Sequence, residues 1–133
     1  MLPFESEAPR GRRVFKAKPF ARAARKASIA DKQLCGAARD VMDAKAEDLG
    51  GGVWKKRLDQ NRKRAIILGR GSRYWVFQYL FDKQNRSGIE EDELRAFRDL
   101  ADVYARLTDD QVSRLVRAGD WKEICNGTEK VQE

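Results

Sequence analysis

The spacing of apolar and polar residues changes near the middle of the chain. In the first part, apolar residues recur at the three- and four-residue intervals of helices, after one short alternating strand over residues 13–18. Pro19 is well suited to the first turn of a helix, which we expect to follow at once. A second helix is expected to be capped by Asp31 and to end at Leu49, before three glycines.

After these glycines the period becomes two. Three runs rich in β-branched and aromatic residues predict consecutive antiparallel strands, namely VWKKRL, RAIILG and RYWVFQYLF. Gly69 and Gly71 bracket Arg70 between the last two runs, which is typical of a hairpin. The last run is almost continuously apolar from Tyr74 to Phe81, as expected of a central strand.

Two more helices are predicted in the last third. Ser87 and Glu90 have the spacing of a capping box before the first, and Thr108 and Gln111 have it before the second, which ends near Gly119. The whole pattern predicts an α+β fold with two N-terminal helices, a small antiparallel sheet of three or four strands, and two C-terminal helices.

The length of 133 residues suits one domain, which we place over residues 13–125, between a flexible extension (1–12) and a tail (126–133). Cys35 and Cys125 lie far apart without CxxC spacing, so we expect buried small hydrophobic residues or inert thiols, with neither a disulfide framework nor a metal or other cofactor. No apolar run is long enough to span a membrane, and the chain begins without the apolar region of a secretory signal. The expected location is therefore the cytoplasm, away from membranes.

Positive charge is concentrated where the sheet is predicted. Residues 52–88 carry ten basic and two acidic side chains, and such a block repels itself unless an anion or a partner compensates it. In the first predicted strand, Lys55 and Arg57 share one face and Lys56 lies on the other. If the tryptophan and leucine of this strand face the core, Lys55 and Arg57 project from the open side. For any single cation, an ordinary solvated side chain is the alternative.

Three stretches of the chain carry a resemblance to a known family: VFKAKPFARAARKASIADKQLCGA, DLGGGVWKKRL and FDKQNRSGIEEDELRAFRDLA. In this order they resemble the RelE/HigB-like toxins of bacterial type II toxin–antitoxin systems, in the RelE/ParE superfamily, and the resemblance covers residues 14–125. It implies a RelE-like fold similar to small α+β ribonucleases, and cleavage of mRNA in the ribosomal A site. It also implies a cognate antitoxin, of the helix-turn-helix DNA-binding type, that holds the toxin inactive.

The resemblance also assigns residues. The predicted catalytic residues are Lys55 and Arg57 on the first sheet strand and Arg64 at the start of the next. Cleavage by the ribose 2′-hydroxyl needs proton transfer and stabilisation of the phosphorane, and it needs no metal. Without histidine in the chain, Lys55 is the proton-transfer group and the two arginines are phosphate ligands. The predicted RNA-binding cations are Lys83, Arg86 and Arg73.

The chain departs from the family pattern at three places. The connector over residues 59–64 is short and lacks glycine, and Gln84 and Glu90 stand where family members carry arginine and tyrosine. These departures leave two alternatives to an mRNA endonuclease. One is a weakened or inactive member that still binds RNA or its antitoxin, and the other is a ParE-like gyrase poison. Fold alone does not choose among them.

Overall fold

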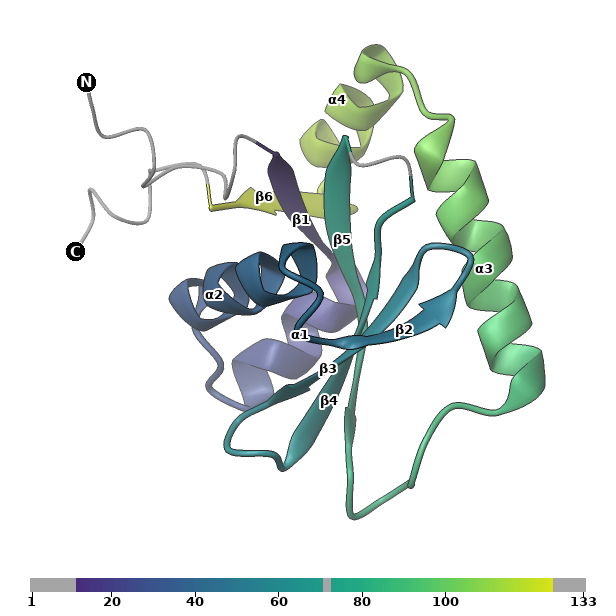
Figure 1. Cartoon of the computed structure of the whole chain (residues 1–133). Helices are drawn as coiled ribbons and strands as arrows, with labels where there is room; N and C mark the ends of the chain where they lie inside the picture. Colours follow the sequence, from purple (N-terminus) through teal and green to yellow (C-terminus); the bar gives the residue numbers. More distant parts are fainter. Residues whose placement is uncertain (1–11, 71–72, 126–133) are drawn as a thin grey trace.

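The computed structural model describes residues 12–70 and 73–125 (Figure 1). The elements in chain order are β1 (Arg13–Ala17), α1 (Lys18–Lys26), α2 (Asp31–Met42), β2 (Glu47–Gly50), β3 (Val53–Leu58), β4 (Lys63–Leu68), β5 (Tyr74–Asp82), α3 (Glu91–Ala105), α4 (Asp109–Arg117) and β6 (Trp121–Ile124). Apart from Arg12, the predicted extension and tail lie outside the described residues. None of the helices in the described ranges is long and apolar enough to cross a membrane.

The α+β class is confirmed, but the predicted sheet is too small. The described strands form one six-stranded sheet in the order β2-β3-β4-β5-β1-β6. β1 pairs with β5 in parallel and with β6 in antiparallel orientation, so the sheet is mixed. The strand predicted over residues 13–18 is confirmed as β1, but it joins the same sheet as the later strands, and β6 follows α4, so the sheet is not confined to the chain between two pairs of helices. β2 and β6 have four residues each, too few to show a period in the sequence.

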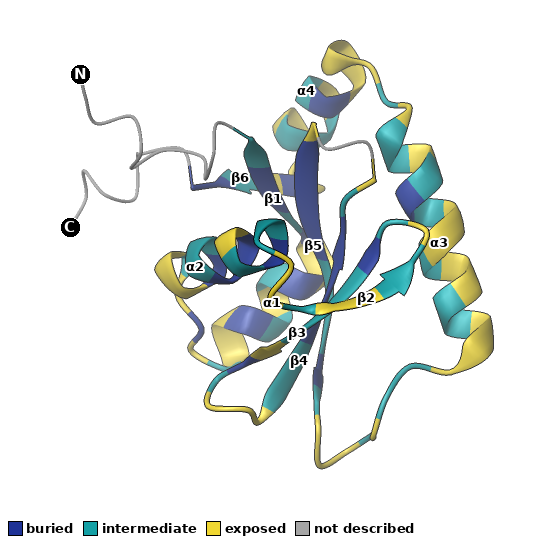
Figure 2. Ribbon diagram, viewed as in Figure 1, coloured by how far each residue is buried: buried dark blue, intermediate teal, exposed yellow. Residues whose placement is uncertain are grey.

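Helices cover both faces of the sheet (Figures 1 and 2). We call the side under α1 and α2 the α1/α2 face and the opposite side the α3/α4 face. Buried residues of the first include Phe20, Leu34, Leu58, Ile67, Trp75 and Phe77. Buried residues of the second include Phe15, Val53, Ile66, Leu68, Val76 and Phe81. β5 lies inside the sheet, as its continuous apolar run predicted.

A register shift in β5 determines on which face of the sheet its last aromatic residues lie. Ile67 faces Phe77, but the preceding residue of β4, Ile66, faces Tyr79, so Gln78 is an extra residue in β5. The shift puts Tyr79 and Phe81 on the α3/α4 face, whereas strict alternation from Phe77 would put them on the other. Nothing in the residue pattern indicates this shift, because both faces of the strand are apolar.

Several helix boundaries differ from the predictions. Residue Ala30, not Asp31, is the N-cap of α2, and α2 ends at Met42 instead of Leu49. The glycines therefore do not end a helix. Gly50, Gly51 and Gly52 all have positive φ and turn the chain from β2 into β3.

The two predicted capping boxes have opposite outcomes. The N-cap of α3 is Glu90, whose backbone N–H donates to Glu93 at 2.9 Å, so the box expected from Ser87 is wrong. Before α4, Thr108 and Gln111 do form the predicted box, with reciprocal bonds of 2.8 and 3.1 Å.

A disulfide joins Cys35 of α2 to Cys125, directly after β6. The expectation of two inert thiols is therefore wrong. The Cα atoms are 5.5 Å apart although the cysteines are separated by 90 positions in the sequence. Spacing rules detect local pairs only, whereas this pair forms because α2 packs on the face of the sheet that also carries Ile124.

Candidate nucleic-acid interface

The three residues predicted to be catalytic lie on one face of the sheet. Lys55 of β3 is opposite Ile66 of β4, and Arg57 is opposite Arg64. Ile66 belongs to the core under α3, and Arg64 is in turn opposite Phe81, which belongs to the same core. Opposed residues in a sheet share a face, so all three cations project from the α3/α4 face. We call this group, Lys55, Arg57 and Arg64, the basic sheet site.

The two arginines of the site are held differently. Arg64 donates from Nη1 to the carbonyl oxygens of Asn61 at 3.0 Å and Lys63 at 3.2 Å. Asn61 is the last of three consecutive residues with positive φ in the β3–β4 turn, and this tight turn brings its carbonyl to Arg64. Arg57 is exposed and makes no ion pair within the described part of the chain. Its guanidinium is therefore available to an external anion.

Lys55 and Lys56 are neighbours on β3 with different surroundings. The Lys55 ammonium is 3.3 Å from the carboxylate of Glu47 on the edge strand β2. Lys56 points to the α1/α2 face, where its ammonium is 3.1 Å from Asp40 of α2. The prediction that Lys56 lies on the other face is confirmed, and its pairing with Asp40 makes it a structural cation.

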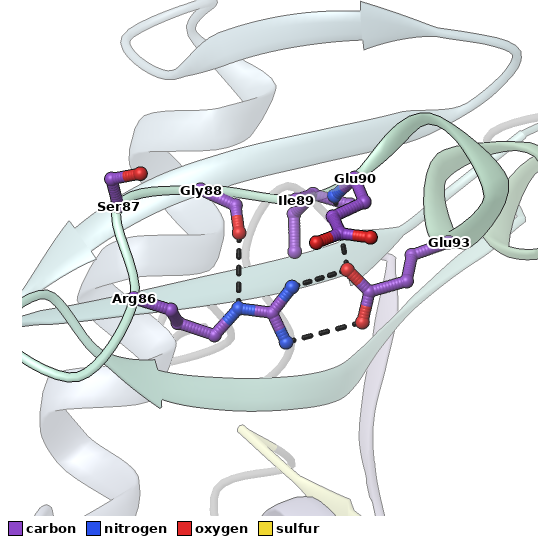
Figure 3. Close-up of a pocket in the computed structure, with 6 residues that line it drawn as sticks. All are labelled: Arg86, Ser87, Gly88, Ile89, Glu90 and Glu93. Atoms are coloured by element: carbon purple, nitrogen blue, oxygen red, sulfur yellow. Dashed lines mark hydrogen bonds and ion pairs between the residues drawn. The ribbon is translucent and has the colours of Figure 1, made fainter.

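Arg86 is engaged by the protein itself (Figure 3). Its guanidinium forms a two-bond ion pair with the carboxylate of Glu93 and donates to the carbonyl of Gly88 at 3.0 Å and the hydroxyl of Tyr79 at 3.1 Å. It also lies 5.5 Å from the ring centre of Phe81. The bond from Arg86 holds the pKa of Glu93 below its usual range, and the bond to Glu93 raises the pKa of Arg86.

The remaining predicted RNA-binding cations lie at opposite ends of β5. Lys83 is exposed in the turn after β5, and its backbone N–H donates to the carbonyl of Arg62, so it lies at the end of the sheet that carries Arg64. Arg73 precedes β5, where it donates to the carbonyl of Leu107 at 2.9 Å. Six residues of strand separate Arg73 from Tyr79, which pairs with the Ile66 opposite Lys55, so at about 3.3 Å per residue roughly 20 Å lies between Arg73 and the nearest part of the basic sheet site. The structure does not bring Arg73 to that site.

Two open hollows lie beside the site. One, of about 680 Å³, is lined by Arg86, Ser87, Gly88, Ile89, Glu90 and Glu93 (Figure 3). Because its two glutamates would repel a phosphate, it does not extend the basic surface. The other, of about 450 Å³, runs between α2 and the β3–β4 turn and is bordered by Arg57. No group of acidic or cysteine side chains suited to a metal ion occurs among the described residues.

The sequence did not reveal the acidic partners of the basic residues. The pair Glu47 and Lys55 and the pair Glu93 and Arg86 lack the spacing of neighbours on a helix, so the sequence pattern does not indicate either contact. For Glu47, the sequence does hold a usable signal, because this acidic residue stands three positions before the first glycine of the turn. A hairpin across that turn places it opposite Lys55.

The fold and the site define a class of protein: a small α+β domain whose mixed sheet presents clustered cations on one face. A sequence model of the family described as the RelE toxin of the RelE / RelB toxin-antitoxin system matches residues 12–124. The chain therefore belongs to the RelE family of toxins of type II toxin–antitoxin systems, as its sequence blocks indicated. This membership implies a cognate RelB antitoxin as partner. A comparison with curated proteins finds no match.

Proposed function

We propose that this toxin is a metal-independent endoribonuclease that cleaves mRNA on the ribosome and so inhibits translation. The observation that supports it best is the register pairing of Arg57 with Arg64, with Lys55 two residues away on the same face. In an antiparallel pair, opposed Cα atoms are about 5 Å apart, so both guanidinium groups can reach one phosphodiester.

The chemistry assigns one task to each side chain. The ribose 2′-oxygen attacks the adjacent phosphorus, an O2′–P bond forms, and the P–O5′ bond breaks. The Lys55 ammonium gives a proton to the leaving 5′-oxygen, and the proton of the 2′-hydroxyl takes its place on the lysine nitrogen, so Lys55 is the proton-transfer group. Arg57 and Arg64 bind the phosphate oxygens and stabilise the charge of the phosphorane. Lys55 engages the substrate by exchanging the carboxylate of Glu47 for the phosphate.

The antitoxin can act on the same surface. We expect an antitoxin of the helix-turn-helix DNA-binding type, in which an acidic segment covers the basic sheet site. Its carboxylates would pair with Arg57 and Lys55 in place of RNA phosphates, so that neutralisation is direct competition.

Primer extension across a translated reporter message tests the proposal. After brief induction of the toxin, cuts should appear inside the reading frame, and they should vanish from a message that lacks its start codon. Cuts that persist without translation would contradict the dependence on the ribosome. An intact message in growth-arrested cells would direct attention to another target, such as gyrase.

Neighbouring lysines provide a matched pair of variants. Lys55→Gln should lower cleavage at least about 100-fold, because proton transfer contributes roughly that factor or more. Lys56→Gln makes the same change one residue away, on the opposite face, and should leave the cut pattern intact. An equal loss of cleavage in both variants would show that cleavage depends on the positive charge of β3 and not on the position of Lys55.

A noncatalytic RNA- or antitoxin-binding member is the second candidate. It is favoured by one observation, the engagement of Arg86 by Glu93, which leaves fewer cations free for the transition state. For such a protein the message stays intact and growth is normal, while RNA binding persists and weakens steeply with salt.

A further inference from the structure

The hollow between α2 and the β3–β4 turn meets the basic sheet site at one residue. Its volume is about 450 Å³, and Arg57 of the basic sheet site is also one of its lining residues. One wall is a side of α2 that includes Gly36 and Arg39, and the other is the turn that includes Gln60 and Asn61. A phosphate bound by Arg57 therefore has this hollow beside it. We call the space the α2 hollow.

The α2 hollow is bordered by polar side chains without a partner in the protein. Arg39 is exposed, and its side chain forms neither an ion pair nor a hydrogen bond within the described part of the chain. The same holds for the side-chain amides of Gln60 and Asn61. Each amide combines an acceptor oxygen with a donor nitrogen. Nucleobases also carry donors beside acceptors along their edges, so free amides of this kind are suited to bind them.

The backbone of the turn is held in an unfavourable conformation. Asp59, Gln60 and Asn61 have φ angles of 53°, 55° and 73°, in the left-handed region that residues other than glycine rarely adopt. Aspartate and asparagine tolerate this region because their short side chains bond locally, whereas glutamine has no such advantage. Glycine at position 60 would relieve the strain, so backbone stability does not explain Gln60. A side-chain amide that binds a ligand does explain it.

Gly36 shows the opposite situation, a helix interior without a side chain. Within a helix, glycine is less favourable than alanine. A Cβ atom at Gly36 would have no neighbouring atom within 4 Å, so close packing does not require glycine at this position. Its bare backbone instead leaves room for a flat ring along this side of α2.

The walls of the α2 hollow favour a nucleobase over an acidic peptide. Asp40 and Asp59 also line it, and they would repel carboxylates but can accept hydrogen bonds from the N–H groups of a base. The apolar lining residues, Ala37 and Leu58, are buried. The hollow therefore lacks the exposed large apolar side chains that anchor a protein partner.

We propose that the α2 hollow binds the base of the message nucleotide next to the phosphate held by Arg57. The amides of Gln60 and Asn61 bind the edge of the base, and its ring lies against the backbone at Gly36. Arg39 supplies a further free donor on the wall formed by α2. This assignment rests on the proposed binding of RNA at the basic sheet site, and it makes the turn residues determinants of base preference.

Binding of short RNA to the full-length toxin tests the proposal without any cleavage. The probe has 2′-fluoro sugars, so it holds no 2′-hydroxyl to attack a phosphate, and it is compared with the same strand lacking one base at each position in turn. At low salt, removal of the base that enters the hollow should weaken binding by the wild type about tenfold. The variant Gln60→Gly/Asn61→Gly should bind both strands with the affinity that the wild type has for the abasic one.

Two further variants separate base recognition from folding. Gly36→Leu fills the α2 hollow from the side of α2 and should weaken binding of the base-containing strand alone. The control, Gln84→Gly, removes an exposed amide from the turn after β5, outside the hollow, and should keep the wild-type preference. By thermal unfolding, Gln60→Gly/Asn61→Gly should be at least as stable as the wild type, because glycine suits the left-handed backbone. Its lost base preference is then not a consequence of unfolding.

Equal affinities of the wild type for all strands, or binding of none, would overturn the proposal. A base preference that survives in Gln60→Gly/Asn61→Gly would overturn it as well. Unchanged RNA binding with weakened antitoxin binding in this variant would assign the α2 hollow to the antitoxin instead. Cleavage is judged separately, on the message. If messages stay intact while the base preference is found, the cleavage proposal fails and the α2 hollow remains a base-binding site.

Discussion

Arg57 and Arg64 lie directly opposite each other on the antiparallel strands β3 and β4. Like charges at opposed positions destabilise a sheet, and no carboxylate of the described residues forms an ion pair with either. The protein thus keeps a repulsive contact at the place where its proposed substrate phosphate binds. A bound phosphate would turn this repulsion into attraction for both guanidinium groups.

Replacing one of these arginines should separate stability from activity. Arg57→Gln removes the repulsion, so the free energy of unfolding should stay the same or rise by up to about 1 kcal/mol at low salt. Cleavage of mRNA should fall at least about 100-fold, since a transition-state ligand is lost. Urea unfolding at low and high salt measures the first effect, because salt screens the repulsion. A clear loss of stability would mean that Arg57 has a structural partner instead.

The ion pair of Arg86 with Glu93 predicts a dependence of stability on pH. The pKa of Glu93 is lower in the folded protein than its ordinary value of 4.5, so the pair stabilises the fold above that value. This contribution is lost as the pH falls through the lower, folded-state pKa. Glu93→Gln should therefore be less stable than the wild type at neutral pH, and the difference should shrink on acidification.

Urea midpoints at neutral and acidic pH measure this effect. The control is Glu91→Gln, which removes an exposed carboxylate from the same first turn of α3. It keeps the bonds of Arg86, so its stability should follow that of the wild type at both pH values. A gap between wild type and Glu93→Gln that does not narrow in acid would contradict the role of the carboxylate.

The disulfide should contribute strongly to stability. It links residues 90 positions apart, and closing a loop of that length restricts the unfolded chain by roughly 4–5 kcal/mol in the chain-entropy description. Reducing the disulfide, or replacing both cysteines in the variant Cys35→Ser/Cys125→Ser, should lower the free energy of unfolding by about 2–5 kcal/mol. Urea unfolding with and without a reductant measures this. Two alkylatable thiols in the unreduced protein, with an unchanged midpoint, would show that the bond is not formed.

The sequence predicted the elements whose pattern is long and one-sided. Strands β1, β3, β4 and β5 and all four helices are predicted at their places in the chain, since each buries a recognisable set of apolar residues. What failed needed information from distant parts of the chain. Short strands such as β2 and β6 exist because a neighbour offers hydrogen-bonding groups, and the parallel pairing of β1 with β5 depends on the path of α1 and α2.

The candidate site was predicted in part for the same reason. Alternation within β3 places Lys55 and Arg57 together, and this is a local property. Arg64 joins them because of strand register, which the residues of β4 alone left undecided. The sequence does not distinguish Arg86 from an unpaired cation, because its partner, Glu93, lies in the next helix. Local patterns thus located the cations, whereas the contacts that engage them come from tertiary structure.

Two glycines offer a comparison of tight and open backbone positions. A Cβ atom at Gly69, at the end of β4, would lie 2.0 Å from Cε3 of Trp75, whose side chain is buried under α1 and α2. Gly69→Ala must displace this ring, so it should lower the free energy of unfolding by about 1–3 kcal/mol. Gly36 lies within α2, where an added methyl group would have no neighbouring atom within 4 Å. Gly36→Ala should therefore raise the free energy of unfolding by roughly 0.5–1 kcal/mol.

Thermal and urea unfolding of both variants measure these opposite shifts, and near-ultraviolet circular dichroism reports the tryptophan environment. The same chemical change is made at both positions, so a general effect of replacing glycine would move both variants in one direction. Gly69→Ala with wild-type stability and an unchanged spectrum would contradict the packing of Trp75 against β4. Because Trp75 also contacts Trp54 of β3, its displacement should disturb the strand that carries Lys55 and Arg57, and cleavage should fall together with stability.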